Sequence, residues 1–137
     1  MNKKTLYLGL FVLALIITYI YICSIEVKGA TEEDLYLVAS VVEAESANQS
    51  ELGKRLVADV IFNRLEAVEY PNTVSEVILQ RGQFTGHRLA PNSSTLRLVE
   101  EELYSRTNSY VLWFRTKRYH KYGRPIVKEG DHYFSGR

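Results

Sequence analysis

The sequence predicts a predominantly helical α+β domain, preceded by one N-terminal transmembrane helix. Three observations lead to this fold class. Apolar residues recur at helical spacing through most of residues 31–108, whereas residues 109–137 are rich in β-branched and aromatic side chains. A long uncharged run stands at the start of the chain. We therefore expect an anchor or uncleaved signal over residues 1–24, a linker over 25–33 and one folded domain over 34–137.

The N-terminal segment has the length and charge pattern of a membrane anchor. Two lysines precede a run without charge from Thr5 to Ser24, close to the ~20 residues that span a bilayer. Because lysines favour the cytoplasmic side, we expect membrane contact through residues 5–23 and an extracytoplasmic domain. Secretion after signal cleavage is the alternative, since Gly29 and Ala30 are small, although Lys28 disrupts the small-x-small pattern of a cleavage site.

Composition excludes several classes of function. The chain of 137 residues has a formal net charge of +1, so the overall balance does not indicate nucleic acid or another polyanion as a partner. A single cysteine, Cys23, excludes a disulfide framework within the monomer and a cysteine metal cluster. Ten tyrosines, five phenylalanines and one tryptophan supply rings that can stack on sugars in a groove.

Capping residues and apolar spacing place four helices after the linker. Thr31 and an acidic first turn predict a helix that runs to about Ser46. Asn48 or Ser50 caps a second helix with apolar residues at helical spacing. A short helix over about 73–80, a loop over 81–91 and a helix that ends near Asn108 complete this part.

The C-terminal region changes to a β pattern. The run "SYVLWFR" is dense in β-branched and aromatic residues, which favours a strand. The run "RPIVKEGDHYF" resembles one further strand with a Gly-Asp interruption. Together they predict a small β-rich or irregular region behind the helices.

Two glutamates, Glu43 and Glu45, stand at the end of the first helix of the domain. With 100° between successive side chains, Glu45 falls on the apolar stripe that contains Val38, Val41 and Val42. A carboxyl group against valines has its charged form disfavoured, as a general acid working near neutrality requires. The alternative is that Glu45 is a solvated end residue or pairs with an arginine such as Arg64 or Arg115. Glu43 lies on the opposite side, where a solvated surface charge is expected.

Several ordered motifs resemble the SleB/CwlJ-type cell-wall hydrolases, the family of spore-cortex-lytic enzymes. They are "EAESANQSELGKRLVADVIFNRL", "YPNTVSEVILQRGQFTG" and "GDHYFS", and they span about residues 34–137. The family's catalytic glutamate stands eight residues before a glycine and eighteen before the asparagine of Asn-Arg. Counting back from Gly53 and Asn63 gives Glu45 both times. Gln49 departs from the family pattern, which has an acidic residue nearby.

The resemblance implies a lysozyme-like fold and cleavage of the β-1,4 bond between N-acetylmuramic acid and N-acetylglucosamine in peptidoglycan. Glu45 would act as a single general acid and base, without a cofactor or metal, in a lytic transglycosylase or a muramidase. Whether the wall is spore cortex or vegetative, and whether a regulatory protein partner holds the enzyme inactive, stay open. The substrate-binding candidates are Gln83, Phe84, Thr85, His132 and Tyr133, with His87 as a further cleft residue, and the structural support is Asn63 and Arg64.

Three rival hypotheses remain. A metallohydrolase would use the three histidines with Asp131, although no two histidines have helical i, i+4 spacing. A catalytically inactive, membrane-anchored wall-binding or scaffold protein would keep the fold without turnover. An inverting hydrolase would add a second acid such as Glu51, Asp59 or Asp131.

Overall fold

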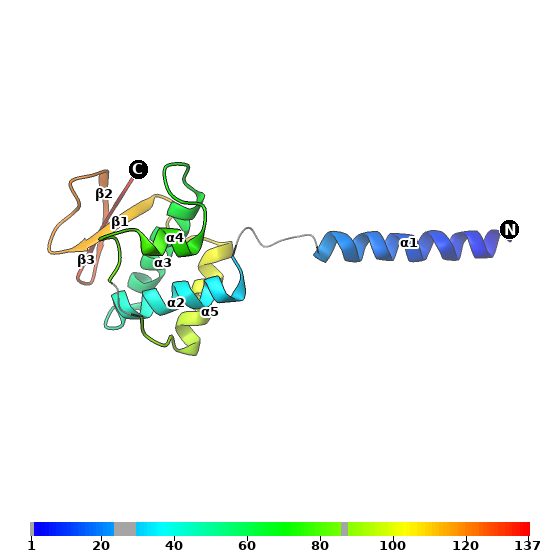
Figure 1. The fold of residues 1–137 in the computed structure, drawn as a ribbon, viewed down its shortest axis with the longest axis horizontal. Coiled ribbons are helices and arrows are strands. Elements are labelled where there is room, and N and C mark those ends of the chain that lie inside the picture. The colour runs from blue at the N-terminus through cyan, green and yellow to red at the C-terminus, as the bar shows by residue number, and fades with distance from the viewer. Residues whose placement is uncertain (1, 24–29, 86–87) are drawn as a thin grey trace.

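The computed structural model describes residues 2–23, 30–85 and 88–137. Figure 1 shows one helix, α1, extending away from a body that contains all the other elements. The elements are, in order, α1 (Lys3–Cys23), α2 (Glu32–Ser46), α3 (Glu51–Glu66), α4 (Val74–Leu79), α5 (Ser93–Tyr104), β1 (Val111–Thr116), β2 (Arg124–Glu129) and β3 (His132–Gly136).

The N-terminal segment is helical, as the sequence predicts. Among the helices of the described residues, however, none has the length and apolarity that a membrane crossing needs. The transmembrane assignment of residues 5–23 is therefore not supported.

Helices α2 and α3 begin where their caps predict. The Thr31 hydroxyl accepts a hydrogen bond from the Asp34 backbone N–H, and the Asp34 carboxylate accepts one from the Thr31 N–H, which forms a capping box. Ser50, rather than Asn48, caps α3 by accepting from the Gly53 N–H. The two helices bury valine, leucine, isoleucine and phenylalanine side chains against each other, and this shared face forms the centre of the core.

Helix α5 ends at Tyr104, four residues before the predicted end near Asn108. The reason is a competing set of hydrogen bonds. The Thr107 backbone N–H and hydroxyl both donate to the Glu102 carboxylate, and the Asn108 N–H donates to Asp59 on α3. These bonds take the backbone donors that continued helix would use.

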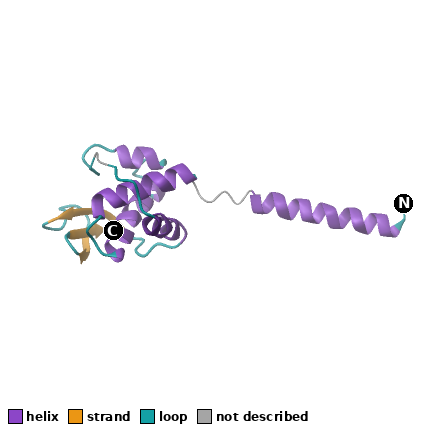
Figure 2. Cartoon of the chain, turned by 90° about the horizontal axis from the view of Figure 1, so that it is seen from below, coloured by secondary structure: helices purple, strands orange, loops and turns teal. Residues whose placement is uncertain are grey.

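The C-terminal region is a three-stranded antiparallel sheet in the order β1-β3-β2. The run predicted as one interrupted strand is therefore a hairpin, β2 and β3. Gly130 lies at its turn with a φ of 54°, a left-handed conformation that glycine adopts without a steric penalty. Figure 2 shows the three strands gathered at one side of the helices.

Alternation along the strands gives the sheet an inner and an outer face. Phe134 is fully buried in the core and pairs with Phe114, so both belong to the inner face. The next residue pair along the strands, Arg115 and Tyr133, then belongs to the outer face. His132 and Tyr133 consequently project from opposite sides of β3.

Candidate active site

Glu45 lies in the last turn of α2, half-buried at the edge of the core. Its Oε1 accepts a hydrogen bond from the Thr85 backbone N–H at 2.5 Å. A second contact of the same loop, from the Leu89 N–H to the Ser40 carbonyl oxygen at 3.3 Å, holds the loop along α2. The carboxyl group is thereby fixed in one orientation where the helix end meets the loop.

His132, the first residue of β3, lies close to this carboxylate. Its side chain is only 5% exposed and meets the Phe114 ring edge-on, with the ring centroids 5.0 Å apart. Burial lowers the pKa of His132, against the opposing influence of the carboxylates of Glu45 and Asp131. The imidazole is therefore neutral at neutral pH. Its Nδ1 has no hydrogen-bond partner among the described residues.

An aromatic wall continues from His132. The ring centroids of Phe84 and Phe114 lie 6.1 Å apart, and the Arg64 guanidinium lies 5.4 Å from the centroid of Phe84. Arg64 is buried, and its Nε donates to the Leu112 carbonyl oxygen at 2.7 Å. Arg64 thus connects the ring of Phe84 to strand β1.

Asn63, one residue earlier on α3, also connects this helix to the start of strand β1. Its Nδ2 donates to the backbone carbonyl oxygens of Asn108 and Val111, both at 2.9 Å. These bonds fix the start of β1 on the helix. Among the described residues, neither Asn63 nor Arg64 forms a hydrogen bond or ion pair with Glu45, so we expect any effect on the site to pass through the sheet.

The structure separates the predicted substrate-binding residues into two groups. Phe84, Thr85 and His132 come together with Glu45. Tyr133 lies on the other face of the sheet, against Tyr119 and the Lys128 ammonium. Gln83 is exposed in the loop, and its predicted role stays a prediction. His87 lies outside the described residues.

The expectation that Glu43 is a solvated surface charge was wrong. Its side chain is 12% exposed, and its carboxylate accepts hydrogen bonds from Lys54 Nζ at 3.1 Å and from the Thr95 hydroxyl at 2.6 Å. Burial would raise the pKa of Glu43, but these hydrogen bonds and the Lys54 charge outweigh it and lower the pKa. Glu43 therefore connects α2 to α3 and α5 as an ion.

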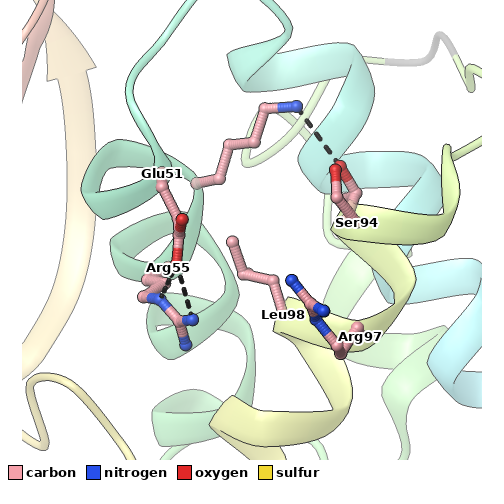
Figure 3. A pocket seen from close by; sticks show the side chains of 7 residues that line it. Glu51, Arg55, Ser94, Arg97 and Leu98 are labelled. Atoms are coloured by element: carbon pink, nitrogen blue, oxygen red, sulfur yellow. Dashed lines mark hydrogen bonds and ion pairs between the residues drawn. The ribbon is translucent and has the colours of Figure 1, made fainter.

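Lys54 also lines a cavity of about 200 Å³ between α3 and α5, with Glu51, Arg55, Ser94, Thr95, Arg97 and Leu98. Figure 3 shows the Arg55 guanidinium turned toward Glu51 on the same helix. Arg55 also pairs with Glu101 and with the buried Glu102. The cations of this cavity are therefore neutralised, and Glu45 does not line it.

Gln49 is a residue whose importance the sequence did not reveal. Its Nε2 donates to Asp131 Oδ2 at 3.2 Å, and its Oε1 accepts from the Asp131 backbone N–H at 3.0 Å. Next to it, the Ser50 hydroxyl donates to Glu129 Oε1 at 2.6 Å. These residues fasten the loop after α2 to the turn before His132. Because 82 positions separate Gln49 from Asp131, local spacing could not indicate the contact.

Within residues 2–23, 30–85 and 88–137, no cluster of three or more His, Cys, Asp or Glu side chains could hold a metal ion. His120 stacks on Trp113, with the ring centroids 6.3 Å apart, whereas His132 faces the core. These two predicted metal ligands thus belong to different faces of the sheet.

Glu45 thus lies half-buried where the helical body meets the small antiparallel sheet, beside His132 and the aromatic wall. Residues 48–135 match the family model of cell wall hydrolases. The match covers more than half of the chain, and the chain belongs to this family. Glu45 itself precedes the matched residues.

Solved structures agree with this assignment. The fold is similar to the catalytic domain of the Bacillus cereus SleB protein, with a TM-score of 0.71 and 30% identity over 79% of this chain and 93% of that one. It is also similar to the catalytic domain of germination-specific lytic transglycosylase SleB from Bacillus anthracis, with a TM-score of 0.68 and 28% identity over 79% and 98%. The helical α+β fold is therefore confirmed.

Curated relatives point the same way. A spore cortex-lytic enzyme of Bacillus cereus is 36% identical over 77 residues, which are 53% of this chain and 30% of that protein. One from Oceanobacillus iheyensis is 38% identical over 58 residues, 42% of this chain and 21% of that protein. The matches thus span less than a third of either relative's length.

Proposed function

We propose that this protein is a peptidoglycan-cleaving lytic transglycosylase that acts on the β-1,4 bond between N-acetylmuramic acid and N-acetylglucosamine. The observation that carries the proposal is the position of Glu45. Its carboxyl group is held by the Thr85 N–H at the junction of helix, loop and sheet, beside His132. Family membership and the likeness to a lytic transglycosylase domain support the same reaction class.

In this mechanism Glu45 acts twice. Its protonated form gives a proton to the glycosidic oxygen as the bond to the anomeric carbon breaks, and the N-acetylglucosamine leaves with a free hydroxyl. The C6 hydroxyl of the muramic residue then attacks the anomeric carbon, and the Glu45 carboxylate accepts its proton. A 1,6-anhydro ring forms, and the acid is regenerated without water.

His132 and Phe84 would orient the sugar. A neutral imidazole can donate one hydrogen bond and accept another, so His132 can hold a sugar hydroxyl without adding a charge beside Glu45. The Phe84 ring offers an apolar face on which a sugar ring can stack. The Thr85 backbone N–H keeps the carboxyl group aimed in both steps.

The second candidate function is hydrolysis to a reducing end, as in a muramidase. The observation that favours hydrolysis is the position of Asp131. Asp131 precedes His132 and acts on it electrostatically together with Glu45. A carboxylate there could activate water. However, its Oδ2 already accepts a hydrogen bond from Gln49, which supports the single-acid mechanism instead.

Mass spectrometry of the muropeptides released from purified vegetative and cortex peptidoglycan tests the reaction. The full chain should release anhydro-muropeptides, and Glu45→Gln should lower the rate by about 10²–10⁴-fold. Glu33→Gln, an exposed glutamate at the other end of α2, is the matched control and should keep full activity. Reducing-end products would overturn transglycosylation, and a folded protein that binds but cuts neither wall would establish the scaffold alternative.

We also propose that the domain works on the extracytoplasmic side of the membrane, where peptidoglycan is found. The uncharged run of residues 5–24 after two lysines supports export. Cell fractionation tests this: the domain should be recovered from the wall and the culture medium or, if it stays with the cell, should be degraded when intact protoplasts are treated with protease. Protection until the membrane is broken would contradict the proposal.

A further inference from the structure

The cations of the chain are unevenly distributed. Residues 111–128 contain six lysines and arginines and no aspartate or glutamate, although the whole chain has a net charge of only +1. We refer to these six residues as the basic face: Arg115, Lys117, Arg118, Lys121, Arg124 and Lys128. The overall balance therefore conceals a positive field over β1, β2 and the loop between them.

The basic face is open to solvent. Five of its side chains are exposed, and Arg115 is half-buried. Among the described residues, none of the six forms an ion pair, whereas Lys54, Arg55, Arg97, Arg106 and Arg137 all do. The cations that line the cavity of Figure 3 differ from these six, because each of them pairs with a carboxylate. The charge of the basic face is thus available to an external anion.

Aromatic rings lie between these cations. Trp113 stacks with His120 at 6.3 Å and lies 6.5 Å from Tyr122, between ring centroids. The Lys121 ammonium is 5.0 Å from the Tyr122 centroid, and the Lys128 ammonium is 5.5 Å from that of Tyr133. Burial lowers the pKa of His120, and the charges of Arg115 and Lys121 lower it further, so these groups share one field.

The outer face is also hollowed. A depression of about 360 Å³ is lined by Thr116, Lys117, Lys128, Gly130, Asp131 and Tyr133. Arg115 and Lys128 flank Tyr133 across the sheet. Asp131 is the acidic group of this lining, and its Oδ2 accepts a hydrogen bond from Gln49. The ammonium groups of Lys117 and Lys128 and the phenol ring of Tyr133 are then available to bind a ligand.

We propose that the basic face binds an anionic polymer of the cell envelope whose charges are phosphodiesters, separate from the glycan that the Glu45 site would cut. Six cations spread along two strands and a loop match a chain of repeated anions better than a single one. The interleaved rings suit the polyol or sugar units between successive charges.

The same face is poorly suited to entering a membrane. Over residues 109–137 the exposed large hydrophobic side chains are Tyr110 and Tyr122, without an exposed leucine, isoleucine, valine, phenylalanine or tryptophan. Membrane-inserting surfaces combine basic residues with such apolar side chains. The polymer therefore fits the surface better than a lipid bilayer does. Bound there, it would hold the enzyme on the wall while the opposite side of β3 faces the glycan.

Binding of the full chain to poly(glycerol phosphate), followed by fluorescence anisotropy at two salt concentrations, tests the proposal. Added salt should weaken binding, because it screens exposed charges. Arg118→Gln/Lys121→Gln should raise Kd roughly tenfold, as expected for a loss of about 1.4 kcal/mol. Arg97→Gln/Arg137→Gln, with the same change of charge at exposed arginines that already pair with carboxylates, should change Kd less than about twofold.

Further probes distinguish the ligand class. Poly(glutamate) and vesicles of phosphatidylcholine with phosphatidylglycerol should bind more weakly than the phosphodiester polymer. Equal losses in both double variants, tighter binding to vesicles or poly(glutamate), or no binding to the polymer would each overturn the proposal. Release of muropeptides from polymer-free peptidoglycan should be unchanged in both variants, so a failure here is distinguishable from a failure of the proposed reaction.

Discussion

Glu43 and Glu45 stand two positions apart on α2 and meet different surroundings. Glu45 contacts a backbone N–H of the loop and lies beside a neutral histidine, whereas Glu43 is held by an ammonium and a hydroxyl group between three helices. In the proposed reaction, the Glu45 carboxyl group transfers protons. The charge of Glu43 instead joins elements, so mutation should separate activity from stability.

Replacing Glu43 by glutamine should destabilise the fold without abolishing the chemistry. The neutral amide leaves the Lys54 ammonium partly buried without its counter-charge, which costs about 1–3 kcal/mol. Because the pKa of Glu43 is lowered in the folded state, this stabilisation is present above its unfolded pKa and is lost as pH falls. Urea unfolding at neutral and acidic pH measures both effects. Equal stability of variant and parent at neutral pH would contradict the assignment.

Asp59 carries a second pH dependence, of opposite sign. It is fully buried, accepts the Asn108 N–H at 2.7 Å and lies near Glu102; burial and this second carboxyl raise the pKa of Asp59 to about 8. Between the unfolded value of 3.8 and about 8, the unfolded chain releases a proton that the folded chain keeps. The contribution of Asp59 to stability therefore decreases as pH rises through this window.

Asp59→Asn should remove this decrease, because the amide oxygen still accepts the Asn108 N–H but no longer titrates. Urea unfolding at about pH 5 and pH 8 should show a smaller fall in the free energy of unfolding for the variant than for the parent. Glu100→Gln, an exposed change on α5, provides the comparison. A variant whose stability falls as steeply as that of the parent would refute the role of Asp59.

At the scale of elements, Gln49 joins the two parts that carry the site. The loop after Glu45 and the turn before His132 are connected by its two hydrogen bonds with Asp131. Gly130 allows this approach, because a Cβ there would stand 1.9 Å from Gln49 Oε1. The distance between Glu45 and His132 thus depends on the side-chain amide of Gln49, which contacts neither of them.

Gln49→Glu should reduce kcat by roughly tenfold or more, because a carboxylate beside Asp131 repels it and displaces the turn. The double variant Gln49→Glu/Asp131→Asn restores a donor and acceptor in reversed order and should recover most of the rate. Muropeptide release at saturating peptidoglycan, with KM determined separately, measures the effect. A rate that falls further in the double variant would show that Asp131 acts in another way.

The elements that sequence could predict are those fixed by local contacts. Thr31 and Ser50 mark helix starts through bonds to residues three positions away, and α2 and α3 follow as expected. The end of α5 depends on Asn108 bonding to Asp59, and the surroundings of Glu43 depend on Thr95, both distant in sequence. Helical periodicity contains no information about such partners. The half-buried position of Glu45 at the end of α2 could be predicted, because its spacing from the apolar residues of the same helix is local.

On the scale of the whole molecule, the core belongs to the part after the linker. All buried apolar residues of the core cluster come from residues 38–134, and Figure 1 shows α1 apart from them. A chain that begins at residue 30 should therefore unfold at the same temperature as the full chain, within about 2 °C. Calorimetry compares the two. A large loss of thermal stability would show that α1 packs on the domain.

The order of the strands has a consequence for how the protein is made. Both β1 and β2 pair only with β3, which the ribosome synthesises after them. Until β3 emerges, neither strand has its neighbour, and the strand that bears His132 does not exist. Nascent chains that stop before Asp131 would hold Glu45 but not its histidine. The sheet, and with it the pairing of Glu45 with His132, can therefore form only when the last residues of the chain have been made.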